Sequence, residues 1–117
     1  LAAADRLIGQ GWQALRKGDF TGAVGHARNA GQQIAAARTG DAAKPRIASV
    51  AAKAGELRQA IALGLNKRIT KLRREADSAM QSGDVDGGKR RLETADRLRR
   101  MLAALNSGAA RRAPTAN

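Results

Sequence analysis

The sequence contains no cysteine and no tyrosine, and it has one tryptophan, one phenylalanine and one histidine. Without cysteine the chain has no disulfide and no thiolate ligand for a metal ion. His26 alone falls short of the three or four protein ligands that a zinc site needs. The shortage of aromatic rings leaves no platform on which bases stack, which disfavours sequence-specific recognition of single-stranded RNA.

Acidic residues are also few. Asp and Glu number 10 against 22 Lys and Arg, which gives the chain a formal net charge of +12. Glu56, Glu75 and Glu93 lie among basic residues in helical segments, so we expect them to form ion pairs, for example Glu75 with Lys71. Nothing in the sequence resembles a nucleophile accompanied by a base and an orienting acid. We therefore predict that the protein is not an enzyme and has no catalytic residue, cofactor or metal.

Large apolar side chains are sparse. Leu, Ile, Val and Phe together make up 20 of the 117 residues, and alanine supplies most of the remaining apolar content. Alanine favours helices and lets them approach closely, but its burial stabilises far less than that of leucine. The composition predicts a thin core, with extra burial against copies or partners. No apolar run approaches the ~20 residues of a membrane span, which disfavours a membrane protein.

One pattern occurs twice, 65 residues apart, over residues 11–30 and 76–95. Each copy is a helical stretch, a Gly-Asp pair and a second helical stretch with small or apolar residues at fixed offsets. This pattern is typical of a helix-turn-helix hairpin that packs against other hairpins.

Local signals predict where the helices begin and end. Glycine suits the left-handed conformation that follows a helix, so Gly18 and Gly83 end helices, and Asp19 or Thr21 caps the next one. Pro45 suits the first turn of a helix. The first, third and fourth predicted helices cover about residues 2–17, 45–82 and 86–106, and the second runs from its cap to about Thr39.

The third predicted helix is long. Its apolar residues recur at spacings of three and four without a break, which favours one continuous helix over a break around residues 64–66. The spacing also resembles a coiled-coil seam and predicts packing of its middle on another copy. We expect an all-α fold of four helices in two hairpins. One helical domain spans 1–106, with hairpins at about 2–39 and 45–106 around a linker at 40–44, and 107–117 forms a flexible basic tail.

The two hairpins resemble tetratricopeptide (TPR) repeats over about half of the chain. The matching residues are Gly11, Gly18, Phe20, Ala23 and Ala30 in the first copy and Ala76, Gly83 and Ala95 in the second. Departures include Val85 at the turn aromatic of the family. The resemblance implies a scaffold that binds peptides or partner proteins, and a generic antiparallel bundle is the alternative.

Two motifs near the second turn are better explained by the turn itself. Residues 83–89 match the P-loop spacing G-x-x-x-x-G-K, but Arg90 follows where Ser or Thr should hold magnesium. The same stretch resembles the start of a calcium loop, but its twelfth position is Ala95 instead of glutamate. A turn and a helix cap account for these residues.

Basic side chains at helical spacing are the best candidates for polyanion binding. They are Lys67, Arg68, Lys71 and Arg74 on the third helix, and Lys89, Arg90, Arg97 and Arg100 on the fourth. If the two helices are antiparallel neighbours, the stripes merge into one surface; the alternative is that both are ordinary solvated faces. The candidates for packing or for a subunit interface are Trp12, Phe20, Ile61 and Leu65. Leu92 is expected to face the core.

These observations lead to one main hypothesis for the function. We expect a non-enzymatic structural or interaction protein that assembles with itself or within a larger complex, with a basic surface facing a polyanion. The alternative is a nucleic-acid-binding protein that contacts the phosphate backbone with little sequence specificity. Binding to an anionic membrane surface is disfavoured because the apolar faces are mostly alanine.

Overall fold

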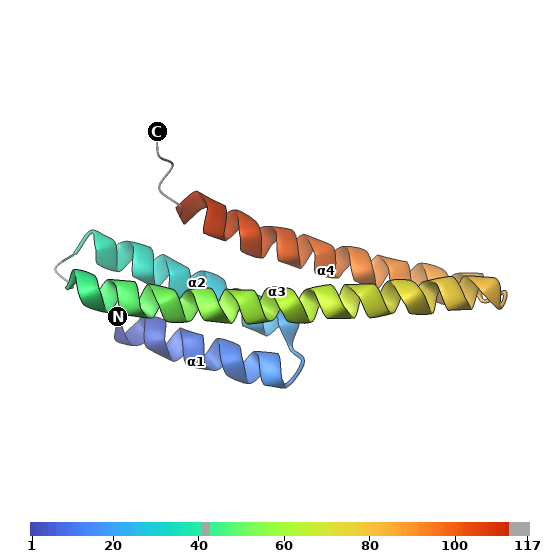
Figure 1. Cartoon of the computed structure of the whole chain (residues 1–117), viewed down its shortest axis with the longest axis horizontal. Helices are drawn as coiled ribbons and strands as arrows, with labels where there is room; N and C mark the ends of the chain where they lie inside the picture. The colour runs from blue at the N-terminus through green and yellow to red at the C-terminus, as the bar shows by residue number, and fades with distance from the viewer. Residues whose placement is uncertain (41–42, 113–117) are drawn as a thin grey trace.

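The computed structural model describes residues 1–40 and 43–112, and there the chain consists of four α-helices (Figure 1). They are α1 (Ala2–Arg16), α2 (Phe20–Arg38), α3 (Lys44–Gln81) and α4 (Val85–Arg112). The predicted all-α fold of four helices with a long third helix is confirmed. Three predicted helices agree with α1, α2 and α3 to within one residue at most ends.

Glycine ends α1 and α3 in the same way. Gly18 and Gly83 have φ angles of 76° and 90°, in the left-handed region that glycine adopts without steric cost. Both turns therefore depend on a residue without a Cβ. This is the physical reason that the Gly-Asp pair occurs in both copies of the repeated pattern.

An aspartate caps the helix that follows each turn. The backbone N–H of Gly22 donates to Oδ1 of Asp19 over 2.9 Å, and that of Gly87 donates to Oδ1 of Asp84 over 3.0 Å. A Cβ at either Gly22 or Gly87 would collide with the capping carboxylate. The two copies thus share an Asp-x-x-Gly capping unit, which also accounts for Gly87 in the apparent P-loop motif.

Replacement of Asp84 by alanine is expected to lower the free energy of unfolding by about 1 kcal/mol, because it removes the acceptor for the Gly87 N–H at the start of α4. Urea denaturation followed by circular dichroism measures this change. Asp84→Asn keeps a capping oxygen and should recover most of the loss. Equal losses in the two variants would contradict the capping role.

The third helix is continuous through Gly64. A Cβ at this position would lie 2.8 Å from Cε1 of Phe20, so the aromatic ring of α2 rests directly on the α3 backbone. Glycine is present here for close packing and does not interrupt the helix. The 38 residues of α3 give it a length of about 57 Å.

The fourth helix ends later than predicted. We expected it to stop near Asn106 and to be followed by a flexible tail, but α4 continues to Arg112. A glycine inside a helix costs only about 1 kcal/mol relative to alanine, and Gly108 is followed by alanine and arginine, which favour helix. Residues 113–117 of the expected tail, and residues 41–42 of the expected linker, lie outside the described residues.

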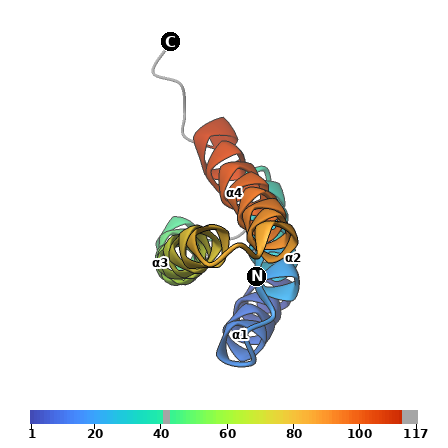
Figure 2. The same cartoon turned by 90° about the vertical axis from the view of Figure 1, so that its right-hand side faces the viewer.

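The four helices form an open, flat arrangement. Each helix is antiparallel to the next along the chain, and α3 lies on one side of a row formed by α1, α2 and α4 (Figure 2). Among the described residues α1 and α4 make no contact, whereas all other pairs do. The molecule measures 61 × 34 × 15 Å along its principal axes.

The main core lies where the first half of α3 covers α1 and α2. Leu57, Ile61 and Leu65 are completely buried there, and Leu57 packs against the backbone of Gly11 in α1. Alanine lines much of α2, which brings the helices close together. Leu105 of α4 joins the same cluster.

Candidate polyanion-binding surface

The second half of α3 and the first half of α4 extend beyond α1 and α2 as a two-helix hairpin (Figure 1). We call residues 67–97 the protruding hairpin. A second, small cluster of Ile69, Leu72 and Ala95 holds it together, with Leu98 packed against it. Because only two helices meet here, most of the hairpin surface faces solvent.

This two-helix construction explains why Leu92 differs from its prediction. We expected Leu92 to face the core, but 39% of its surface is exposed. No third helix covers the hairpin at this level (Figure 1). The apolar periodicity of α4 therefore continues along the helix beyond the part that contributes to the main core.

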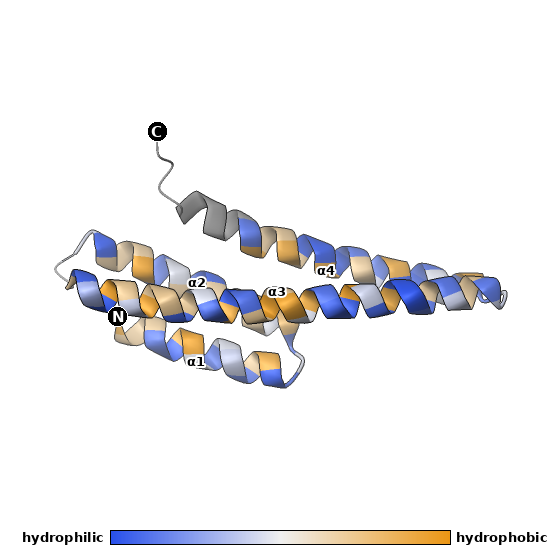
Figure 3. Ribbon diagram, viewed as in Figure 1, coloured by the Kyte–Doolittle hydropathy of each residue, from blue (hydrophilic) through white to orange (hydrophobic). Residues whose placement is uncertain are grey.

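The positive charge of α3 is concentrated in one stretch of the helix. Residues 57–74 contain six basic residues and no acidic residue. Figure 3 shows that apolar residues recur where α3 covers α1 and α2, and that hydrophilic residues become more frequent in the protruding part. The positive charge of α3 is thus concentrated on the side of the molecule that has little core.

A shallow groove runs along the solvent side of α3 in this stretch. Its lining consists of Leu63, Asn66, Lys67, Thr70, Lys71 and Arg74, all exposed. These six residues form the solvent-facing side of α3, which we call the α3 ridge. Its residues lie about half a helical turn from the buried Ile69 and Leu72, so they project away from the core. Leu63 is 63% exposed and forms the end of the ridge nearest the main core.

The predicted stripes of α3 and α4 do not merge. All eight predicted basic side chains are exposed. However, α3 and α4 pack through the faces that carry Leu72 and Ala95, so Lys67, Lys71 and Arg74 project away from α4. The remaining α3 candidate is Arg68. It lies seven residues, or about two helical turns, before Glu75, so it is on the side of α3 that carries Glu75.

The α4 stripe also differs from the ridge in its charge pattern. Acidic residues alternate with its basic residues, which are Lys89, Arg90, Arg97 and Arg100. The acids are Asp86, Glu93 and Asp96. A surface with both signs attracts a polyanion less than the ridge, whose three charged residues are all cations.

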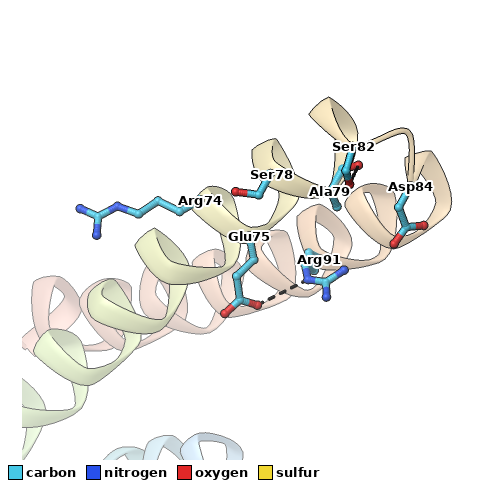
Figure 4. A pocket seen from close by; sticks show the side chains of 7 residues that line it. All are labelled: Arg74, Glu75, Ser78, Ala79, Ser82, Asp84 and Arg91. Carbon is cyan, nitrogen blue, oxygen red and sulfur yellow. Dashed lines mark hydrogen bonds and ion pairs between the residues drawn. The ribbon is translucent and has the colours of Figure 1, made fainter.

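Glu75 pairs across the hairpin and not along its own helix. Oε2 of Glu75 accepts from Nε of Arg91 over 3.4 Å (Figure 4). Nη1 of Arg91 also donates to the carbonyl of Gly87 over 3.1 Å. The prediction that Glu75 pairs with Lys71 was wrong. Both side chains of the pair are about 40% exposed, so solvent screens it and it contributes little to stability. Arg74 points away from this pair (Figure 4).

The packing candidates fall into two groups. Ile61 and Leu65 are completely buried within the chain, so neither is available to a second copy. Trp12 and Phe20 are partly buried and pack against the main core. The expected coiled-coil contact through the middle of α3 is therefore replaced by packing on α1, α2 and α4.

None of the described helices combines the length and apolarity needed to cross a membrane. Within the described residues no three His, Cys, Asp or Glu side chains are grouped so as to hold a metal ion. The chain matches no protein-family model, no curated protein and no solved structure.

Proposed function

We propose that this chain is a non-enzymatic helical interaction protein that binds the phosphate backbone of a nucleic acid through the α3 ridge. The observation that supports this proposal is the line of three exposed cations, Lys67, Lys71 and Arg74, in a stretch without acidic residues. The ion pair between Glu75 and Arg91 includes none of these three cations, which leaves them available to a ligand.

The physical basis is the release of counterions. Lysine and arginine that neutralise phosphates displace the cations condensed on a nucleic acid, which favours binding and makes it strongly dependent on salt. Contacts of this kind position a protein on the backbone without reading bases. The near absence of aromatic residues is consistent with this mode, since no stacking platform is available.

Removal of the three ridge cations is expected to weaken binding at least about tenfold at about 0.1 M salt, because three phosphate contacts are lost. The variant is Lys67→Gln/Lys71→Gln/Arg74→Gln, and the probe is a labelled random duplex of about 30 base pairs. Fluorescence anisotropy over a salt series measures both the dissociation constant and its salt dependence. The slope of log K against log salt should fall by about 3.

A charge-matched variant on α4 serves as the control. Arg90→Gln/Arg97→Gln/Arg100→Gln removes the same three charges from exposed positions of a surface with both signs. We expect it to change the slope less than the ridge variant does. Equal effects would mean that net charge alone attracts the duplex, and no binding by the native chain at low salt would exclude the proposed function.

A further inference from the structure

Apolar side chains gather on one flank of the protruding hairpin, near its tip. Met80, Val85 and Leu92 are 39%, 48% and 39% exposed. Cγ of Met80 lies 2.7 Å from the position of a Cβ on Gly88, so this side chain lies across from α3 onto α4. Val85, Gly88 and Leu92 share one face of α4 by their spacing of three and four. We call Met80, Val85 and Leu92 the tip patch.

The tip patch faces away from the rest of the molecule. On α3, Gly64 marks the side that contacts α2, because Phe20 rests on it. The helical repeat places Met80 about half a turn from Gly64 around the α3 axis. The patch is therefore open to a partner without interference from α1 or α2. It is also distinct from the α3 ridge.

Charges of both signs surround the tip patch. Arg73 and Asp77 precede Met80 by seven and three residues on α3, and Lys89 and Asp96 share the face of Val85 on α4. All four side chains are exposed. The ion pair between Glu75 and Arg91 includes none of them. These four residues are two acids and two bases, in contrast to the ridge, and exposed Arg99 follows on the same face of α4, about one turn beyond Asp96.

The antiparallel register of α3 and α4 places these four charges at two heights along the hairpin axis, which we call levels. Met80 lies beside Gly88, and Glu75 lies beside Arg91. The same antiparallel register places Asp77 of α3 close to the level of Lys89 of α4. It also places Arg73 close to the level of Asp96. Each level therefore has an acid on one helix and a base on the other.

We propose that the tip patch is a contact surface between two copies of this chain, related by a two-fold axis parallel to the hairpin. Such an axis sets α3 of one copy against α4 of the other at the same level. Asp77 then faces Lys89 of the second copy, and Arg73 faces Asp96 of the second copy. Each of these opposite-charge pairs forms twice, because a two-fold contact is self-complementary. The partner is thus a copy of the chain itself, which goes beyond the proposed binding of a nucleic acid.

The mixed charges around the tip patch also explain why this surface suits a second copy. A chain with a net charge of +12 repels its own copies over most of its surface. At the tip patch apolar area coincides with charges of both signs, so association buries apolar surface while opposite charges meet. An acidic partner would instead be drawn to the ridge.

Sedimentation equilibrium of the full chain without nucleic acid tests the contact at about 0.15 M salt, where the Debye length is about 8 Å. We expect a monomer–dimer equilibrium and a dissociation constant raised at least about tenfold by Val85→Glu, which places a charge in the patch. An acid in the first turn of α4 suits the helix dipole, so the fold should be retained, as circular dichroism verifies.

Leu63→Glu is the matched control. It introduces the same charge at an exposed apolar residue outside the tip patch, and it should leave the dissociation constant within about twofold. Equal weakening by the two variants would overturn the proposal. A native chain that stays monomeric up to about 1 mM would overturn it as well.

Charge exchange tests the two-fold arrangement directly. Asp77→Lys and Lys89→Asp each place like charges opposite one another and should weaken the dimer. The double variant Asp77→Lys/Lys89→Asp restores an acid opposite a base and keeps the net charge at +12, so it should recover dimerisation. Both changes suit the helix dipoles at their positions. A double variant that is weaker than either single one would contradict this arrangement.

Discussion

Replacement of Leu57 by alanine is expected to lower the free energy of unfolding by about 2–5 kcal/mol, because it opens a cavity in the main core. Leu57 is completely buried, and its Cδ2 lies 2.6 Å from the position of a Cβ on Gly11. The side chain therefore joins α3 to α1 with no space between them. A change of this size is a large part of the about 5–15 kcal/mol that stabilises a typical domain.

The effect should be especially visible in this protein because few large side chains share the core. Urea denaturation measures the loss, and Leu63→Ala on the same helix is the control. Leu63 is 63% exposed, so its replacement should change the free energy of unfolding by no more than about 0.5 kcal/mol. A similar effect of the two substitutions would show that Leu57 does not hold α1 against α3.

Replacement of Gly64 by leucine is expected to lower the free energy of unfolding by about 1–3 kcal/mol, because the new side chain would have to displace the ring of Phe20. Glycine is normally unfavourable within a helix, so without tertiary contact the same change would stabilise α3. The sign of the effect therefore reports the contact between α2 and α3. Chemical denaturation measures it.

Two comparisons separate packing from helix propensity. Gly55 lies on the same helix, and the nearest atom to a Cβ there is Nη2 of Arg58 at 3.8 Å, so Gly55→Leu should stabilise the protein by up to about 1 kcal/mol. Combining Gly64→Leu with Phe20→Ala removes the displaced ring and should make the glycine replacement much less harmful. If Gly64→Leu costs the same with and without the ring, Phe20 is not the reason for the glycine.

The sequence predicts helix boundaries well where one residue determines them. The left-handed conformations of Gly18 and Gly83 are local properties of glycine, and Pro45 lies in the first turn of α3 as expected. At the end of α4 the prediction failed because we expected Asn106, Ser107 and Gly108 together to end the helix. The four residues that follow, 109–112, are alanine and arginine, which favour helix and outweigh this local signal.

The candidate surface was predictable only in part. The spacing of Lys67, Lys71 and Arg74 places them on one face of a helix whatever that helix packs against. The partner of Glu75, in contrast, depends on how α3 and α4 are aligned. Glu75 and Arg91 are each eight residues from Gly83, and this symmetry about the turn was the signal that could have indicated their pairing.

Exposure near the hairpin tip was not predictable from spacing. Leu92 has the periodicity of a core residue, and its exposure follows from the absence of a third helix at that level. Periodicity tells which face of a helix is apolar, but it does not tell how far along the helix a partner extends. That information lies in the lengths of all four helices together.

The continuity of α3 has a consequence for the entropy of binding. The first half of this helix is anchored in the main core, so the backbone of the second half is ordered before any ligand arrives. Binding at the ridge then restricts only side-chain rotation, at about 0.5–1.5 kcal/mol for each long side chain. A disordered segment with the same charges would also have to order its backbone, at about 1–2 kcal/mol per residue. The long helix thus uses burial at one end to preorganise the cations at the other.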